Sequence, residues 1–222
     1  MASTYWTRAG NASLVVCALV VTTVLVRREF FSSGVREGAA LEFQDVPDWR
    51  RYQESGHSIG AERAPVELIV FSDFECPACR VFFMSSLRGV MESHRGRIKV
   101  TVRHFPLSYH RFAYPAARAS ECAGAQSRFI EFHELIFRKQ DSLGLKTFEA
   151  FATESGVSDI RAFNTCVSSA QKVTAIEVDL AAGRKVAVRG TPGVIMNGRL
   201  YSTPPDSASL ERFVSVILAG KP

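Results

Sequence analysis

The sequence predicts an α/β fold in which a helical subdomain is inserted between strands, preceded by an N-terminal membrane helix. Three observations predict it. An apolar, β-branched run at 66–71 leads into Cys76-Pro77-Ala78-Cys79 and then into a helical pattern. Strand patterns at 97–105 and 193–202 enclose about seventy residues of helical periodicity. An uncharged apolar stretch of eighteen residues lies at 9–26.

We interpret residues 1–28 as an N-terminal membrane anchor or signal segment. Tyr5 and Trp6 suit one membrane interface, and Arg27 and Arg28 mark the other end of the apolar stretch. A cleaved signal peptide is the alternative, but no small-x-small cleavage site follows closely, which favours an uncleaved anchor. Arginines lie on both sides, so their distribution does not orient the segment.

Residues 29–45 are predicted to be a linker because 30–40 is rich in Ser, Gly and charge. A short helical turn is expected around Trp49, and 56–65 is expected to be a loop entering the first strand.

The placement of Cys76-Pro77-Ala78-Cys79 between a strand and a helix predicts redox chemistry. The unpaired N–H groups and the dipole at the first turn of a helix favour a thiolate, so the pKa of Cys76 should be lowered. Pro77 suits the first helical position, where a missing N–H costs nothing. Cys79 lies one turn further on, with its sulfur more buried. Cys76 is therefore the expected attacking thiol and Cys79 the resolving one.

Half of a zinc site is the competing interpretation of the two cysteines. Zinc would need two further ligands, and the sequence has no second Cys-x-x-Cys and no His-x-x-x-His. We therefore expect no metal at this motif.

The other elements follow from periodicity and capping. Asn197-Gly198 predicts a tight hairpin turn, and Asp206 is a candidate helix cap. Strands are expected at 97–105, 186–188, 193–196 and 199–202, and helices at 115–124, 127–138, 147–153, 159–169, 170–182 and 206–218.

Composition limits the possible functions. The chain has 222 residues, 46% of them hydrophobic, with a net charge of +5. The basic residues are scattered, which indicates a solvated surface and no nucleic-acid interface. No nucleotide-binding motif appears, so we expect no cofactor beyond the protein's own sulfurs.

In the order of its predicted strands and helices and in its motifs, the chain resembles the DsbA family of thiol–disulfide oxidoreductases. The residues that carry the resemblance are the motif ending in Cys79, the stretch Phe132-His133-Glu134-Leu135 and the segment Gly190-Thr191-Pro192-Gly193. The resemblance implies a thioredoxin fold built from 46–111 and 185–222, with an inserted helical subdomain at 112–184.

The resemblance also implies a cis Thr191–Pro192 bond whose loop faces the cysteines and binds substrate. Two departures from the family concern the tuning of the site. Val70 stands where the family often has a buried glutamate, so proton transfer is left to water or Glu75. Ala78 replaces the histidine of the strongest oxidants, so we expect a less acidic Cys76 and a moderate reduction potential.

Cys122 and Cys166 both fall in the helical subdomain. In an oxidising compartment such a pair favours a structural disulfide, as in some members of the family, whereas in the cytosol both would be buried apolar side chains. His133, on an apolar stripe, is expected to be a core residue, and His104, close to a strand end, is a candidate for a place near the site.

The predicted function is a membrane-anchored, extracytoplasmic oxidoreductase that introduces disulfides into exported proteins. Its expected partners are reduced or unfolded exported proteins and a quinone-linked membrane oxidase. A reductase or isomerase with the same residues is the alternative, and a chaperone-like binding protein is a less favoured one.

Overall fold

The computed structural model describes Thr22 and residues 42–220. Apart from Thr22, the predicted membrane segment 1–28 lies outside the described residues, and so does the predicted linker up to residue 41. Within the described part of the chain, no helix has the length and apolar character needed to cross a membrane.

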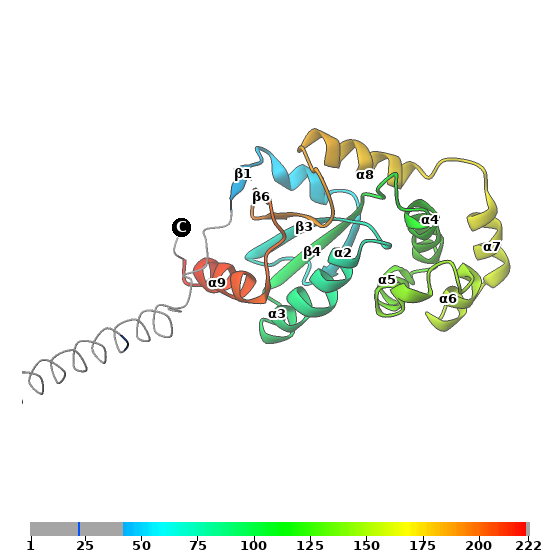
Figure 1. The fold of residues 1–222 in the computed structure, drawn as a ribbon, viewed down its shortest axis with the longest axis horizontal. Coiled ribbons are helices and arrows are strands. Elements are labelled where there is room, and N and C mark those ends of the chain that lie inside the picture. The colour runs from blue at the N-terminus through cyan, green and yellow to red at the C-terminus, as the bar shows by residue number, and fades with distance from the viewer. Residues whose placement is uncertain (1–21, 23–41, 221–222) are drawn as a thin grey trace, which may run out of the picture. The chain divides into compact units, whose positions relative to one another are not determined.

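A six-stranded mixed sheet forms the centre of the described domain (Figure 1). Its strand order is β1-β6-β5-β3-β4-β2, with β3 and β4 parallel and every other neighbouring pair antiparallel. The strands are β1 (Phe43–Asp45), β2 (His57–Gly60), β3 (Val66–Ser72), β4 (Ile98–His104), β5 (Gly193–Met196) and β6 (Arg199–Tyr201). Strands β3 and β4 are almost wholly buried, which explains their apolar, β-branched sequences.

Two sequence-based predictions are wrong at the sheet edges. Residues 43–45, assigned to the linker, form β1 and pair with β6, and 57–60, assigned to a loop, form β2 and pair with β4. Both are short edge strands. Ile59 is the only large apolar residue of β2, so its sequence lacks the alternation that identifies a strand.

The two faces of the sheet are covered by different helices. On one face pack α2 (Pro77–Val81), the π-helical turn η2 (Phe82–Leu87), α3 (Arg88–Ser93) and α9 (Ser207–Leu218). The other face is covered by η1 (Trp49–Gln53) and α8 (Thr174–Lys185). Asp206 caps α9, because its side chain accepts a hydrogen bond from the Ser209 N–H.

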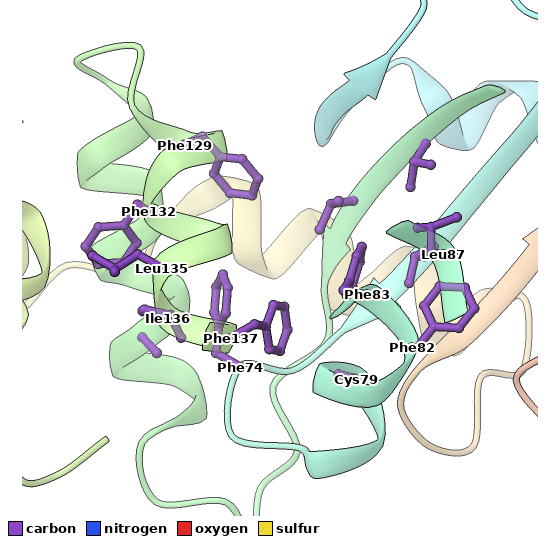
Figure 2. Close-up of a cluster of buried hydrophobic side chains, with 14 of the residues drawn as sticks. Phe74, Cys79, Phe82, Phe83, Leu87, Phe129, Phe132, Leu135, Ile136 and Phe137 are labelled. Atoms are coloured by element: carbon purple, nitrogen blue, oxygen red, sulfur yellow. The ribbon is translucent and has the colours of Figure 1, made fainter. Parts of the chain in front are cut away.

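Between β4 and β5 the chain forms the helical segment α4 (Ala113–Gly124), α5 (Phe129–Arg138), η3 (Gln140–Ser142), α6 (Phe148–Glu154) and α7 (Ile160–Ser168), and then α8. Figure 2 shows Phe129 and Phe132 projecting from opposite sides of α5, and Phe74 beside Phe137 at the end of this helix. The rings of Phe74 and Phe137 lie 5.2 Å apart, and those of Phe83 and Phe137 lie 5.3 Å apart. One continuous core thus joins this segment to the α2–α3 helix.

The strand predicted at 186–188 is absent, because these residues end α8. The N–H of Val188 bonds to the Gly183 carbonyl, and that of Ala187 to the Arg184 carbonyl. Ala187 has a φ of 61°, which completes a Schellman cap. Val186 and Val188 are the apolar residues of this cap, and their pattern resembles that of a strand.

Candidate active site

Cys76 lies at the N-terminus of α2, immediately after the loop that leaves β3. It is the N-cap residue and Pro77 follows at the first helical position. The N–H groups of Cys79 and Arg80 both bond to the Cys76 carbonyl, at 3.1 and 3.3 Å. The structure therefore confirms that the motif lies at the start of a helix. Pro77 and Ala78 are exposed.

The two sulfurs have different surroundings. Cys76 is 7% exposed, whereas Cys79 is fully buried at 0%. A hydrogen bond from the Cys79 thiol lowers the pKa of Cys76 to about 5, and Thr191 and the N–H groups of Cys79 and Ala78 add to this effect against the opposing effect of burial. Burial raises the pKa of Cys79 well above its ordinary value. At neutral pH Cys76 is therefore the thiolate and Cys79 the thiol.

The Thr191–Pro192 loop lies beside Cys76. Its peptide bond is cis, and the Cys76 thiol donates to the Thr191 carbonyl at 3.2 Å. The side-chain oxygen of Thr191 is buried and has no hydrogen-bond partner among the described residues. Next to the loop is a groove of about 510 Å³, whose lining includes Phe43 of β1, Tyr201 of β6 and residues 187–193.

Asp73 organises the loop between β3 and Cys76, a role that the sequence did not predict. Its buried carboxylate accepts from the N–H of Glu75 and of Leu107 and pairs with His110, each at 2.8 Å. Its own N–H donates to the Cys79 sulfur at 3.5 Å. The only sequence signal for this role was the position of an acidic residue between a buried strand and the redox motif. Its partners Leu107 and His110 lie more than thirty residues away in the sequence.

The helical segment holds the same loop from the opposite side. Gln140 is buried, and its amide donates to the carbonyls of Phe74 and Cys76 at 2.8 and 3.0 Å. The Glu75 carboxylate accepts from the Phe112 N–H just before α4. Glu75, expected to help in proton handling, thus connects the redox loop to the helical segment.

The remaining predicted residues lie further from the two thiols. Cys122 of α4 and Cys166 of α7 form a disulfide, with their Cα atoms 5.9 Å apart. His133 is buried among Phe74, Phe83, Phe129 and Phe137, and burial lowers its pKa to about 3. His104 bonds to Glu121 rather than to either redox cysteine.

The family model described as "Thioredoxin" matches residues 52–215, so the chain belongs to the thioredoxin family. The fold is that of the DsbA-like proteins described next, and the Cys-x-x-Cys motif at a helix start is the arrangement typical of redox-active members of the thioredoxin family. Oxidised BdbD of Bacillus subtilis superposes with a TM-score of 0.69 at 18% identity, over 82% of this chain and 100% of that one. α-DsbA1 of Wolbachia pipientis superposes with a TM-score of 0.61 at 20% identity, over 73% of this chain and 90% of that one.

The chain is also similar in sequence to longer proteins that are named as antiporters. A Na(+)/H(+) antiporter NhaA 1 of Mycolicibacterium gilvum is 33% identical over 166 residues, which are 72% of this chain and 26% of that protein. The corresponding protein of Mycolicibacterium vanbaalenii is 32% identical over 163 residues, 25% of its length. The chain therefore spans about a quarter of the curated relatives it matches.

Proposed function

We propose that the chain is an extracytoplasmic, membrane-anchored thiol–disulfide oxidase that donates the Cys76–Cys79 disulfide to exported proteins. The observation that carries the proposal is the pair of unequal sulfurs at the N-terminus of α2. A thiolate with a pKa of about 5 is a good leaving group, so a disulfide that contains it is readily reduced by a client.

The reaction proceeds in two thiol–disulfide exchanges. A client thiolate attacks the Cys76 sulfur of the oxidised enzyme, the Cys76–Cys79 bond breaks, and its electron pair leaves with Cys79, which takes up a proton. A second client thiolate then attacks the client sulfur of the mixed disulfide, and Cys76 leaves as a thiolate. The client loses two electrons, which remain in the reduced Cys76 and Cys79.

Thr191 and Pro192 are proposed to bind the client chain during the exchange. The cis bond turns the loop toward Cys76, and an extended peptide can pair with its backbone. The adjacent groove, with Phe43 and Tyr201 in contact at its side, suits the apolar side chains of an unfolded protein.

A second disulfide supports the proposed location. The Cys122–Cys166 disulfide is a feature of proteins in oxidising compartments. A domain of this kind, tethered by a segment such as 1–28, would be reoxidised by a quinone-linked membrane protein. That protein takes up the two electrons and restores the Cys76–Cys79 bond.

Single-turnover transfer to a dithiol peptide tests the direction of the reaction. We expect the oxidised full chain to form the peptide disulfide within seconds, and Cys76→Ser to abolish the transfer. A Cys79→Ala variant first converted to a mixed disulfide between Cys76 and a small thiol should give a stable enzyme–peptide adduct through Cys76 with a peptide that carries one thiol, because no second thiol is present to release it. Slow transfer, together with rapid reduction of disulfide peptides by the reduced chain, would indicate a reductase. Binding of unfolded chains that survives Cys76→Ser without any thiol exchange would indicate a chaperone.

A further inference from the structure

Three potential metal-ligand side chains from separate segments converge at the edge of the sheet. His57 begins β2, His104 ends β4, and Glu121 lies in α4. Both Nε2 atoms contact the same Glu121 Oε1, at 2.7 Å from His57 and 2.8 Å from His104. The three ligand atoms all lie within 4.8 Å of one another. The cluster is separate from the redox cysteines.

The surroundings hold these side chains in place. His104 is buried, and its ring also lies 3.5 Å from the Ser120 hydroxyl. The His57 ring stacks on Phe129, with centroids 3.4 Å apart and an interplanar angle of 6°. Gly124 lets this ring approach α4, because a Cβ there would lie 3.1 Å from its Cε1 atom. The two imidazoles therefore have little rotational freedom left to lose on binding.

Two imidazoles and one carboxylate are a ligand set that zinc takes, with a fourth position left for water. In a tetrahedral site with bonds of about 2.0–2.1 Å, ligand atoms lie roughly 3.3 Å apart. The two N···O distances of 2.7 and 2.8 Å would open by about half an ångström. Rotation of the Glu121 side chain can supply this, since that side chain is partly exposed on α4.

A groove reaches one of the three ligands, His57. This groove, of about 410 Å³, has His57 in its wall, next to Ser58, Gly124 and Phe129. Glu131 also lines this groove, where its carboxylate pairs with Arg128 at 2.7 Å. An entering cation therefore meets the imidazole of His57 in the wall of this groove.

We propose that His57, His104 and Glu121 form a Zn²⁺ site that fastens the helical segment to the sheet. Two ligands belong to the strands β2 and β4, and the third belongs to α4, so the bound ion would connect these elements directly. Hydrogen bonds alone link the same groups when no ion is bound, and the metal would make that link stronger. The sequence did not indicate the site, because His57 and Glu121 are 64 positions apart and the three ligands follow no spacing motif.

Titration with Zn²⁺ alone tests the site in the full chain carrying Cys76→Ser and Cys79→Ser, so that no redox thiol is available to the metal. We expect one equivalent to bind in competition with a chromophoric chelator and to raise the midpoint temperature of unfolding. Co²⁺ should give the intense visible bands of a four-coordinate nitrogen and oxygen site. Mg²⁺ and Ca²⁺, which prefer oxygen ligands, should leave the midpoint unchanged.

Two variants keep the local packing and remove one ligand each. His57→Phe retains a ring against Phe129, and Glu121→Gln retains the size of the side chain. Each should weaken Zn²⁺ binding about 100-fold or more while the apoprotein remains folded by circular dichroism. His94→Phe is the matched control, since His94 pairs with Glu211 at 2.7 Å elsewhere on the surface. It should leave the affinity unchanged.

Three results would overturn the proposal. One is the absence of saturable Zn²⁺ binding to the folded chain. Another is binding that His57→Phe and Glu121→Gln both leave intact. The third is loss of the zinc equivalent in His94→Phe, which would place the ion at that surface pair.

Discussion

The thiol of Cys76 donates a hydrogen bond to the backbone carbonyl of Thr191, although 115 positions separate the two residues. The contact depends on the antiparallel pairing of β3 and β5, in which Phe71 lies opposite Gly193. The chain leaves β3 toward Cys76 and enters β5 from Thr191 at the same end of this pair. The redox helix and the cis loop are thus positioned by two adjacent strands of the core.

Replacing Thr191 with Val should raise the pKa of Cys76. The change keeps the shape of the side chain but removes its buried hydroxyl, which has no partner among the described residues and is free to donate to the Cys76 thiolate, an interaction that lowers this pKa. Thiolate absorbance in the ultraviolet, followed against pH in the reduced chain, gives the value. The same change at an exposed threonine, Thr203→Val, is the matched control and should leave the titration unchanged. An unchanged pKa in Thr191→Val would show that the Thr191 hydroxyl does not stabilise the Cys76 thiolate.

The stability of the reduced protein should depend on pH through Cys76. Its pKa is lowered on folding, so the ionised thiolate stabilises the folded reduced state. This contribution is complete above the unfolded pKa of about 8.5 and is lost as pH falls through about 5. Urea unfolding of the reduced chain across this pH range should show this contribution as a loss of stability toward low pH, and Cys76→Ser should lack that loss. If the free energy of unfolding depends on pH in the same way in the wild type and in Cys76→Ser, the lowered pKa of Cys76 is contradicted.

Replacing Gln140 with Met should destabilise the protein and disturb the redox loop. The amide of Gln140 bonds to the carbonyls of Phe74 and Cys76, and its loss leaves buried acceptors without this donor. The expected cost is about 1–3 kcal/mol, measured by urea unfolding. Gln171→Met, at an exposed position, is the control and should cost little. Equal stabilities of the two variants would show that the Gln140 bonds are not important.

Removing the Cys122–Cys166 disulfide by a double change to Ser should lower the free energy of unfolding. The bond closes a loop with a sequence separation of 44. Chain entropy gives about 4 kcal/mol for a loop of that length, and about 2–4 kcal/mol is typical in practice. Disulfide exchange at Cys76 should continue in the folded variant. A loss of exchange at temperatures where the variant is folded would mean that this disulfide takes part in the reaction.

The sequence was most informative where local chemistry decides the structure. The strand before Cys76, the helix start at Pro77 and the Asn197-Gly198 hairpin all lie where their residues indicated, since each depends on neighbours in the chain. The positions of Asp73 and Gln140 in the site depend on partners more than thirty residues away, which no periodicity encodes. Strand β2 was missed because a short edge strand with one large apolar residue needs its pairing partner to be recognised.

The equilibrium of Cys76 and Cys79 with glutathione buffers tests the proposed oxidase most directly. A pKa of about 5 for Cys76 lies between the values of about 3.5 for DsbA and 7 for thioredoxin. We therefore expect a reduction potential between roughly −120 and −200 mV, which would support disulfide donation to clients. A value near the roughly −270 mV of thioredoxin would contradict it and indicate a reductase supplied with electrons from elsewhere.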